Sequence, residues 1–428
     1  MDTSKHPTPP HPTPRRIYYG WIVLAVAMVA GSFSTGLGVW GVSIFLRPMT
    51  EALGWSRSSF FAALTVRSLV AGVLAPFIGP LLDTPNGPRR LMLLSAVLLG
   101  VSLMGVRFVN NIWEFYLLFG VVGGIAQVTG ANSLTHSILP KWFVRKRGRV
   151  LGIAAMGPGL GPMIFPVSIQ SLIEFTDWRT AWFVLGIVAI AILVPMSFLV
   201  RTRPEDMGLL PDGDIVPPEE RGEGRPRQPR RLEGLTRSEG IRTPAFWLIV
   251  VSFMLVGIGI GGFHANLVPF FQDAGLSAGT AALSGTAFAI CSVSTRPVWG
   301  ILAERVPVRY ILGPLLIMAA GSVLLVLNVG GKPSMLIAAG VHGVAIGAYI
   351  SLQGLVVADY FGRSHLGAIN GMIRPFMTGA GALSPLMIAV LFDLRDSYTV
   401  AFLIIAVGWL FAGVLMFMAS PPAKRTDP

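Results

Sequence analysis

The chain has 428 residues, of which 53% are hydrophobic and only 13% are charged, and its mean hydropathy is +0.67. A soluble domain would carry about 25% charged residues, so the composition excludes that class and predicts an integral membrane protein. The net charge of +12 would suit a nucleic-acid-binding protein, but the placement of the basic residues described below argues against it. The lone cysteine, Cys291, excludes an internal disulfide and a cysteine-based metal cage.

Twelve apolar stretches follow one another along the chain, each near the ~20 residues that a membrane-spanning helix needs. The runs are continuous rather than alternating, which favours helices over a transmembrane barrel. Residues 1–14 are polar and predict a disordered cytoplasmic tail rather than a signal peptide. The expected helices cover 17–46, 57–82, 88–109, 112–139, 148–173, 179–200, 244–271, 278–303, 308–329, 333–358, 366–391 and 397–419.

The segment 201–243 interrupts this series after the sixth helix. It is rich in Pro, Gly, Arg and Glu and lacks helical periodicity, which is typical of a flexible linker. The expected organisation is therefore a six-helix bundle at 15–200, a cytoplasmic linker at 201–243, a second six-helix bundle at 244–420 and a short tail at 421–428.

The two halves resemble each other. Gly79-Pro-Leu-Leu-Asp83 matches Gly300-Ile-Leu-Ala-Glu304, and Gly54 matches Gly275, both at an offset of 221 residues. Pro166 and Pro385, like Asp177 and Asp396, share an offset of 219. A repeat that keeps its order and spacing predicts two similar bundles related by an axis along the membrane normal, with a substrate site between them.

The basic residues lie mostly at one set of helix ends. Of the 33 lysines and arginines, 24 fall in the termini, the linker and the loops on that side. This asymmetry follows the positive-inside rule and predicts that both termini are cytoplasmic. It also explains the net charge without nucleic acid as a partner.

Motifs at several helix ends are similar to those of a known superfamily. Gly79-x-Leu-x-Asp83, with Arg89 and Arg90 after it, resembles the loop signature of the major facilitator superfamily, and Gly300-x-Leu-Ala-Glu304-Arg305 resembles a degenerate second copy. The resemblance implies an all-α membrane protein with twelve transmembrane helices in two pseudo-symmetric six-helix bundles. It also implies a cytoplasmic gate, for which the candidates are Asp83, Arg89, Arg90, Glu304, Arg305, Arg145 and Arg147. Ordinary topology charge is the alternative for these residues.

Three further motifs narrow the family. The segment from Trp142-Phe143 through the basic triplet 145–147 to Gly157 resembles the fifth-helix signature of the monocarboxylate transporters, and Arg296-Pro297-x-x-Gly300 resembles their eighth-helix motif. Tyr18-Tyr19-Gly20-Trp21 is similar to the first-helix entry of the oxalate/formate-type relatives. The resemblance implies that Arg296 binds a substrate carboxylate. Two family positions tied to proton coupling differ, because Ser292 replaces an acid and Trp40 replaces a lysine.

Arg296 is also informative on its own. An ionised guanidinium at membrane depth costs on the order of 2.5–3.5 kcal/mol even on mild insertion scales, so it needs a wet cavity and a partner. No acid lies in the centre of any expected helix, whereas three arginines do: Arg67, Arg296 and Arg374. This bias predicts an anionic ligand, which a guanidinium grips through two parallel hydrogen bonds. The alternative for Arg296 is a structural arginine bonded to backbone carbonyls.

The other candidates for substrate binding are weaker. Arg67 and Arg374 are possible second anchors, with packing or hydrogen bonding between helices as the alternative. His264 and His342 are candidate proton carriers, although a lone histidine on an apolar helix is more often a packing residue. Gln127 and Gln353 offer neutral hydrogen bonds, and Trp40 offers an apolar cavity wall.

The sequence thus predicts a secondary transporter of a small organic anion, with a monocarboxylate as the favoured substrate, working by alternating access in the plasma membrane (the inner membrane of a bacterium). Uptake, with or without a proton, is favoured over exchange, and efflux of drugs or metabolites is a competing interpretation. No catalytic constellation, phosphate-binding loop, metal site or cofactor motif is present, so an enzyme is not predicted. No obligate protein partner is indicated.

Overall fold

The computed structural model describes residues 18–78, 81, 84, 86–130, 138–143, 146–213, 235–303, 305–361 and 366–422. These residues form helices and turns, with no strand among them. The predicted all-α class is therefore confirmed for the described part of the chain.

The first half contains six helical spans. They are α1 (Gly20–Thr35) with η1 (Gly36–Trp40) and α2 (Gly41–Leu53), then α3 (Arg57–Ile78), α4 (Gly87–Val106), α5 (Ile112–Phe115) with η3 (Tyr116–Val122) and α6 (Gly123–Thr129), α9 (Arg147–Ala154) with α10 (Gly157–Phe175), and α11 (Trp178–Leu199). A short helix, α8 (Leu139–Trp142), precedes the fifth span. Both η1 and η3 are π-helical turns inside longer helices, a form that is frequent at functional sites.

The second half repeats this plan with α13 (Pro244–Asp273), α14 (Ala278–Ala303), α15 (Val308–Leu327), α16 (Lys332–Phe361), α17 (Leu366–Arg395) and α18 (Thr399–Met418). Within the described ranges, eleven of the twelve spans are long and apolar enough to cross a membrane. The remaining span is α14, whose hydropathy is lowered by three serines, three threonines and Arg296.

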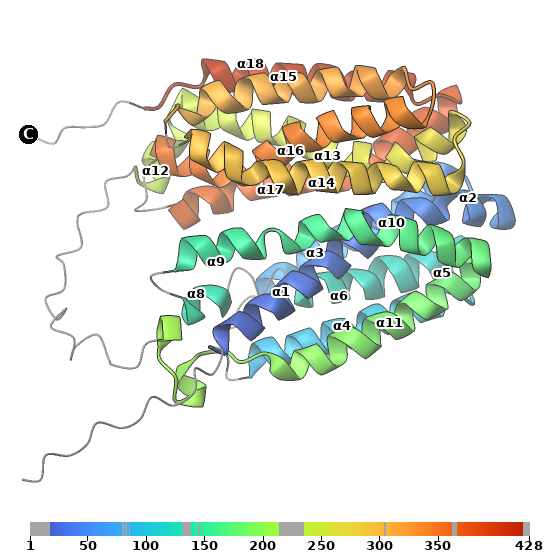
Figure 1. The fold of residues 1–428 in the computed structure, drawn as a ribbon, viewed down its shortest axis with the longest axis horizontal. Helices are drawn as coiled ribbons and strands as arrows, with labels where there is room; N and C mark the ends of the chain where they lie inside the picture. The colour runs from blue at the N-terminus through green and yellow to red at the C-terminus, as the bar shows by residue number, and fades with distance from the viewer. Residues whose placement is uncertain are drawn as a thin grey trace, which may run out of the picture.

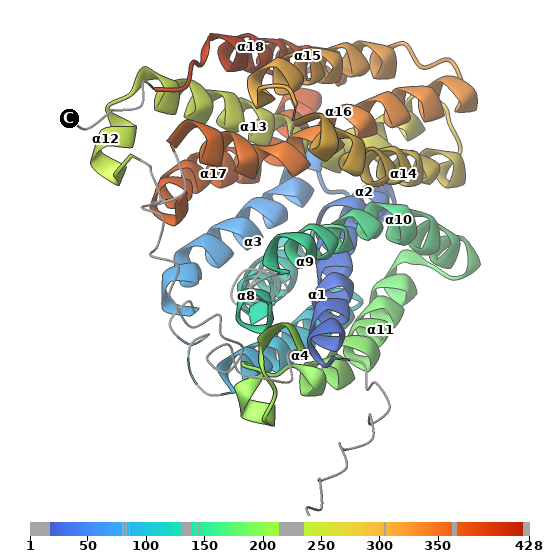
Figure 2. The same ribbon diagram turned by 60° about the vertical axis from the view of Figure 1, so that its left-hand side comes forward.

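The two halves form two layers of nearly parallel helices, with the first half below and the second half above in Figure 1. The N-terminal end of α1 and the C-terminal end of α18 lie on the same side of the molecule in Figure 1, which we call the termini end. We call the opposite side the far end. Helices α10 and α14 lie side by side between the layers in both views (Figures 1 and 2). The contact between the bundles is therefore built largely on these two helices, together with α3 and α17.

Local sequence explains where several helices begin. Asn111 and Glu114 form a capping box at the start of the fourth span, and Asp177 accepts hydrogen bonds from the amides of Arg179 and Thr180 at the start of α11. Such caps satisfy backbone donors that have no partner inside the helix.

The internal repeat extends to backbone geometry. Gly54 ends α2 with φ +68°, and Gly275 follows α13 with φ +89°. Both adopt the left-handed conformation that glycine tolerates best, at the offset of 221 residues found in the sequence. The repeat is less exact in structure at Asp177 and Asp396. Asp396 has φ +53°, and the Thr399 amide donates its hydrogen bond to Ser397 Oγ, at 3.2 Å, rather than to Asp396.

The segment between the bundles differs from the expected linker without helices. Its described parts contain η5 (Glu205–Met207), η6 (Pro211–Gly213) and α12 (Arg237–Ile241). The last of these begins with a capping box between Thr236 and Glu239. Local capping thus creates short helices that hydrophobic periodicity does not predict.

Candidate functional site

The candidate site lies along the contact between α10 and α14. At Gly285 the backbones approach so closely that an added Cβ would lie 2.7 Å from the carbonyl oxygen of Pro162 and 3.1 Å from the Trp40 ring. The neighbouring Thr286 donates a hydrogen bond from Oγ1 to the carbonyl oxygen of Met163 at 3.0 Å. Small residues thus allow α10 of the first bundle and α14 of the second to pack closely, as is common for helices within a membrane.

Arg296 reaches across this contact from α14. Its Nη1 donates a hydrogen bond of 2.8 Å to the carbonyl oxygen of Ala155, at the junction between α9 and α10. That carbonyl is available because the helix breaks there. In a continuous helix it would accept a hydrogen bond from the Gly159 amide, but this amide donates to the carbonyl oxygen of Met156 at 2.9 Å instead. Pro158, at the start of α10, has no amide hydrogen to continue the hydrogen-bond ladder of α9, which favours a break there.

The remaining donors of Arg296 have no acceptor among the described residues. Its Nε is shielded from solvent and has no hydrogen-bond partner, and no carboxylate among the described residues lies within ion-pair distance. Ser292, one helical turn earlier, is also buried, and its Oγ has no hydrogen-bond partner in the described part of the chain. The guanidinium is therefore only partly satisfied by the protein, and it lies between the bundles rather than facing lipid.

An aromatic wall borders the same contact closer to the far end. The ring of Trp40, on η1, lies 5.1 Å from that of His264 on α13 and 5.2 Å from that of Phe288 on α14. Trp40 and His264 are both almost fully buried. Trp40 of the first bundle thus packs against the second bundle.

Two histidines of the second bundle form one hydrogen-bonded chain. His264 Nε2 lies 3.0 Å from His342 Nε2, and His342 Nδ1 lies 2.9 Å from Ser322 Oγ. Ser322 donates its own proton to the carbonyl oxygen of Ala319 at 2.6 Å, so it accepts from His342. His342 in its neutral form then carries its proton on Nδ1, and His264 donates through Nε2.

The other predicted binding residues do not gather at Arg296. Arg67 and Gln127 line a separate cavity within the first bundle. Arg374 on α17 is exposed, and Gln353 on α16 is half-buried; neither forms a side-chain hydrogen bond to a described residue.

The predicted gate can be followed only in part. Asp83, Glu304 and Arg145 lie outside the described residues, as does the side chain of Arg147. The guanidinium of Arg89 lies 4.8 Å from the centre of the Phe198 ring, within the same bundle. Arg90 and Arg305 are exposed and make no ion pair within the described ranges.

A polar latch that sequence reasoning missed joins the bundles at the far end. Arg57 forms a two-pronged ion pair with Asp273, with nitrogen–oxygen distances of 2.6 and 3.1 Å, and it also contacts the Tyr398 hydroxyl. Its guanidinium lies 3.8 Å from the centre of the Phe392 ring, and the amide of Ser58 donates to Asp393 at 3.0 Å.

Burial raises the pKa of the Tyr398 phenol above its usual value near 10, so this hydroxyl stays protonated even in alkaline buffers near that value. The sequence offered one signal for this ion pair. Arg57 and Asp273 lie within three residues of Gly54 and Gly275, the glycines that repeat between the two halves.

The aromatic motifs at the termini end contact one another. Tyr18 donates a hydrogen bond to the carbonyl oxygen of Trp142 at 2.9 Å, and its ring meets that of Phe143 edge-on at 5.5 Å. Tyr19 donates to the carbonyl oxygen of Leu199 at 2.8 Å. Two motifs that are far apart in the sequence therefore form one cluster that anchors α1 to α8.

Comparisons with known proteins agree with this architecture. The family model described as Major Facilitator Superfamily matches the chain twice, over residues 28–284 and 249–428. A bacterial homologue of the human lysosomal transporter Spinster, solved in an inward-facing and occupied conformation, superimposes with a TM-score of 0.70 at 14% identity, covering 94% of this chain and 97% of that chain.

Curated relatives are also transporters. Monocarboxylate transporter 11 of Mus musculus is 26% identical over 416 residues, which is 95% of this chain and 88% of the relative. The oxalate:formate antiporter of Oxalobacter formigenes is 25% identical over 289 residues, covering 67% of this chain and 64% of the relative.

A helical membrane protein with two repeated six-helix bundles and a polar site between them has the design of a secondary transporter. The chain belongs to the major facilitator superfamily, so it is a transporter of small molecules and not an enzyme.

Proposed function

We propose that this transporter carries a small organic anion, a monocarboxylate in the first place, by alternating access of a site between the two bundles. The observation that supports it most is Arg296, a membrane-embedded guanidinium whose Nε has no partner and which reaches the opposite bundle. The names of two relatives, a monocarboxylate transporter and an oxalate:formate antiporter, favour the same class of substrate.

In this proposal, Arg296 binds the carboxylate. A planar guanidinium with one edge unused can donate two parallel hydrogen bonds to a carboxylate, which adds specificity as well as affinity. The apolar part of the substrate then packs against the wall formed by Trp40, His264 and Phe288. Binding at the α10–α14 contact couples the substrate to the relative position of the bundles.

Alternating access in this proposal uses the latch at the far end. Breaking the pair between Arg57 and Asp273 opens that end, while the predicted gate around Arg89 and Arg305 closes the termini end. We further propose that the termini lie in the cytoplasm and that the protein is located in the plasma membrane, as the asymmetry of the basic residues suggests.

Ligand-dependent thermal unfolding of the purified protein tests the substrate class. Monocarboxylates should raise the midpoint, whereas amides of the same shape should not, because a ligand that binds only the native state stabilises it by mass action. The shift should disappear in Arg296→Gln. It should persist in the control Arg395→Gln, which changes an exposed arginine at the end of α17. A shift produced by neutral or cationic compounds and retained in Arg296→Gln would favour the efflux alternative.

Uptake into proteoliposomes separates proton-coupled transport from exchange. We propose uptake with a proton, in which an inward proton gradient drives accumulation without any internal anion. An exchanger would instead require vesicles preloaded with a counter-anion. The departures at Ser292 and Trp40 make this comparison necessary, because neither side chain carries the charge that the family uses for coupling.

A further inference from the structure

Arg67 is a second membrane-embedded arginine, and it has no acidic partner within the described ranges. It lies on α3, is only 5% exposed, and its guanidinium stands 5.0 Å from the centre of the Phe119 ring. No carboxylate among the described residues comes within ion-pair distance of it. A cation–π contact offsets only part of the cost of burying a full charge.

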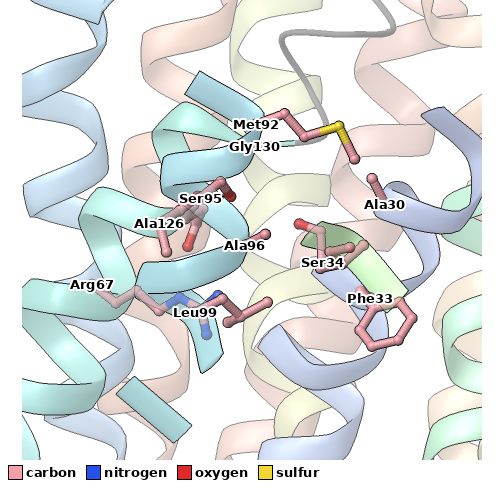
Figure 3. Close-up of a pocket in the computed structure, with 12 residues that line it drawn as sticks. Ala30, Phe33, Ser34, Arg67, Met92, Ser95, Ala96, Leu99, Ala126 and Gly130 are labelled. Atoms are coloured by element: carbon pink, nitrogen blue, oxygen red, sulfur yellow. Dashed lines mark hydrogen bonds between the residues drawn. The ribbon is translucent and has the colours of Figure 1, made fainter. Parts of the chain in front are cut away.

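A small cavity, which is not fully enclosed, lies beside this guanidinium, with a volume of about 30 Å³. Figure 3 shows Arg67 and Ser34 approaching it from α3 and α1, with Ser95 and Leu99 of α4 along the side. A single water needs about 10–15 Å³ by this measure, so the cavity holds one or two small species.

The polar groups around the cavity are mostly donors without acceptors. Arg67 Nε has no hydrogen-bond partner, and the side chains of Ser34 and Gln127 form no hydrogen bond to any described residue. The hydroxyl of Ser95 already donates to the carbonyl oxygen of Ala126 at 2.7 Å. Three helices thus direct a guanidinium, a hydroxyl and an amide toward one cavity that holds no negative charge.

We propose that this cavity binds a small monovalent inorganic anion of the size of chloride. An anion there neutralises Arg67 and accepts hydrogen bonds from Ser34 and Gln127, while Phe33, Met92 and Leu99 form the apolar part of the wall. A neutral water can accept hydrogen bonds from these donors but leaves the charge uncompensated.

The cavity belongs to one bundle, which determines the role of the anion. All of its lining residues come from α1, α3, α4, α6 and α11 or from Gly130, which ends α6. Rocking of the two bundles therefore leaves the site intact. The anion is resident: it stabilises the first bundle and is not carried across the membrane.

Thermal unfolding in chloride-free gluconate buffer, with chloride added at constant ionic strength, tests the proposal on the full-length protein. The midpoint should rise with chloride and saturate. In Ser34→Ala, half-saturation should move to at least about threefold higher chloride, and in Arg67→Gln the rise should be lost. Sulfate, a divalent and larger anion, should not replace chloride.

The controls separate this site from the substrate site. Arg296→Gln should keep the chloride response while losing the response to carboxylates, and Arg67→Gln should show the reverse. If Arg67→Gln does not fold, Ser34→Ala and Gln127→Ala carry the test, because both remove a donor without exposing a charge. An unfolding midpoint of the wild type that is independent of chloride, or a chloride response unchanged in both of these variants, would overturn the proposal.

Discussion

Arg57 on α3 and Asp273 on α13 form a two-pronged ion pair that joins the two bundles at the far end of the molecule. Arg47 adds a longer contact of 3.7 Å to the same carboxylate. Both partners of the main pair are less than one-quarter exposed, so solvent screens this pair less than an ordinary surface salt bridge. It is therefore a suitable latch for a conformation in which the far end is closed.

Breaking this latch should open the far end. In a Cys291→Ala background, Ala382→Cys places a thiol on α17 beside the hydrogen bond from Thr65 to the Ala382 carbonyl. Adding Arg57→Ala should raise the labelling rate by a membrane-impermeant maleimide about tenfold, since a latch worth ~1.4 kcal/mol shifts a two-state equilibrium by that factor.

The exchanged pair Arg57→Asp with Asp273→Arg should restore slow labelling in part, because the contacts of Arg57 with Phe392 and Tyr398 are not recovered. Arg395→Ala is the matched control at the same end, and it should leave labelling unchanged. Equal labelling of the wild type and Arg57→Ala would show that the ion pair does not hold this end closed.

Gly285 is expected to be essential for transport for steric reasons. An alanine Cβ at this position would meet the Pro162 carbonyl oxygen at 2.7 Å and push α10 and α14 apart. Gly285→Ala should therefore reduce the transport rate at least about tenfold with the protein still folded. Gly279→Ala on the same helix would meet only Glu174 Oε1 at 3.7 Å, an ordinary contact, and should transport normally. Equal rates in the two variants would exclude the close approach as a requirement.

The chain of His264, His342 and Ser322 should contribute measurably to stability. An average hydrogen bond between helices in a membrane is worth about 0.6 kcal/mol. Ser322→Ala also leaves the Nδ1 proton of His342 buried without an acceptor, which costs about 1–3 kcal/mol. The unfolding midpoint in detergent should fall clearly below that of Ser252→Ala, which removes one buried hydrogen bond to Ala412. A smaller fall for Ser322→Ala would mean that the tautomer assigned to His342 is incorrect.

The Asp177 cap should make stability depend on pH. Hydrogen bonds from the Thr180 side chain, and then from the Thr180 and Arg179 amides, lower the pKa of this carboxyl below its usual value. A lowered pKa in the folded state means that the ionised group stabilises the fold above the ordinary value near 3.9, and that this contribution is lost as the pH falls through the folded pKa.

Asp177→Ala should therefore lower stability by about 1 kcal/mol at pH 7, as expected for a lost cap. The difference from the wild type should shrink below about pH 4 as the wild-type carboxyl is protonated. Asp177→Asn, whose amide oxygen can still accept the backbone hydrogen bonds, is the control and should stay close to the wild type at pH 7. Unfolding midpoints measured across this pH range decide the matter.

Much of the architecture could be predicted because the membrane leaves few options. A continuous apolar run must be a helix in lipid, so eleven of the spans in the described ranges, and their order, follow from hydropathy. The span 278–303 was predicted with the same bounds that α14 has, since Gly275-Leu-Ser277 precedes it and charged residues follow it. The repeat of Gly54 and Gly275 likewise marked the same turn in both halves.

Several residues of the site could be predicted from the sequence, but the contacts that they make could not. Arg296 was identified because a charge in an apolar helix is conspicuous, whereas its contact with Ala155 depends on a helix break that only the packed structure reveals. Arg57 and Asp273 looked like ordinary charges at helix ends, because their pairing joins residues 216 positions apart. Arg67 was found as a candidate anchor, but its cavity depends on the packing of five helices around it.

Uptake of a radiolabelled monocarboxylate into proteoliposomes containing wild-type, Arg296→Gln or Arg296→Lys protein is the most direct test of the function. Both variants should fold and reconstitute as the wild type does. Arg296→Gln should lose at least about tenfold in uptake, because a charge-assisted hydrogen bond is worth about 1.5–3 kcal/mol, and Arg296→Lys should also be impaired because a point charge lacks the two-pronged geometry. Wild-type uptake in Arg296→Gln would contradict the assignment of Arg296 as the residue that binds the transported anion.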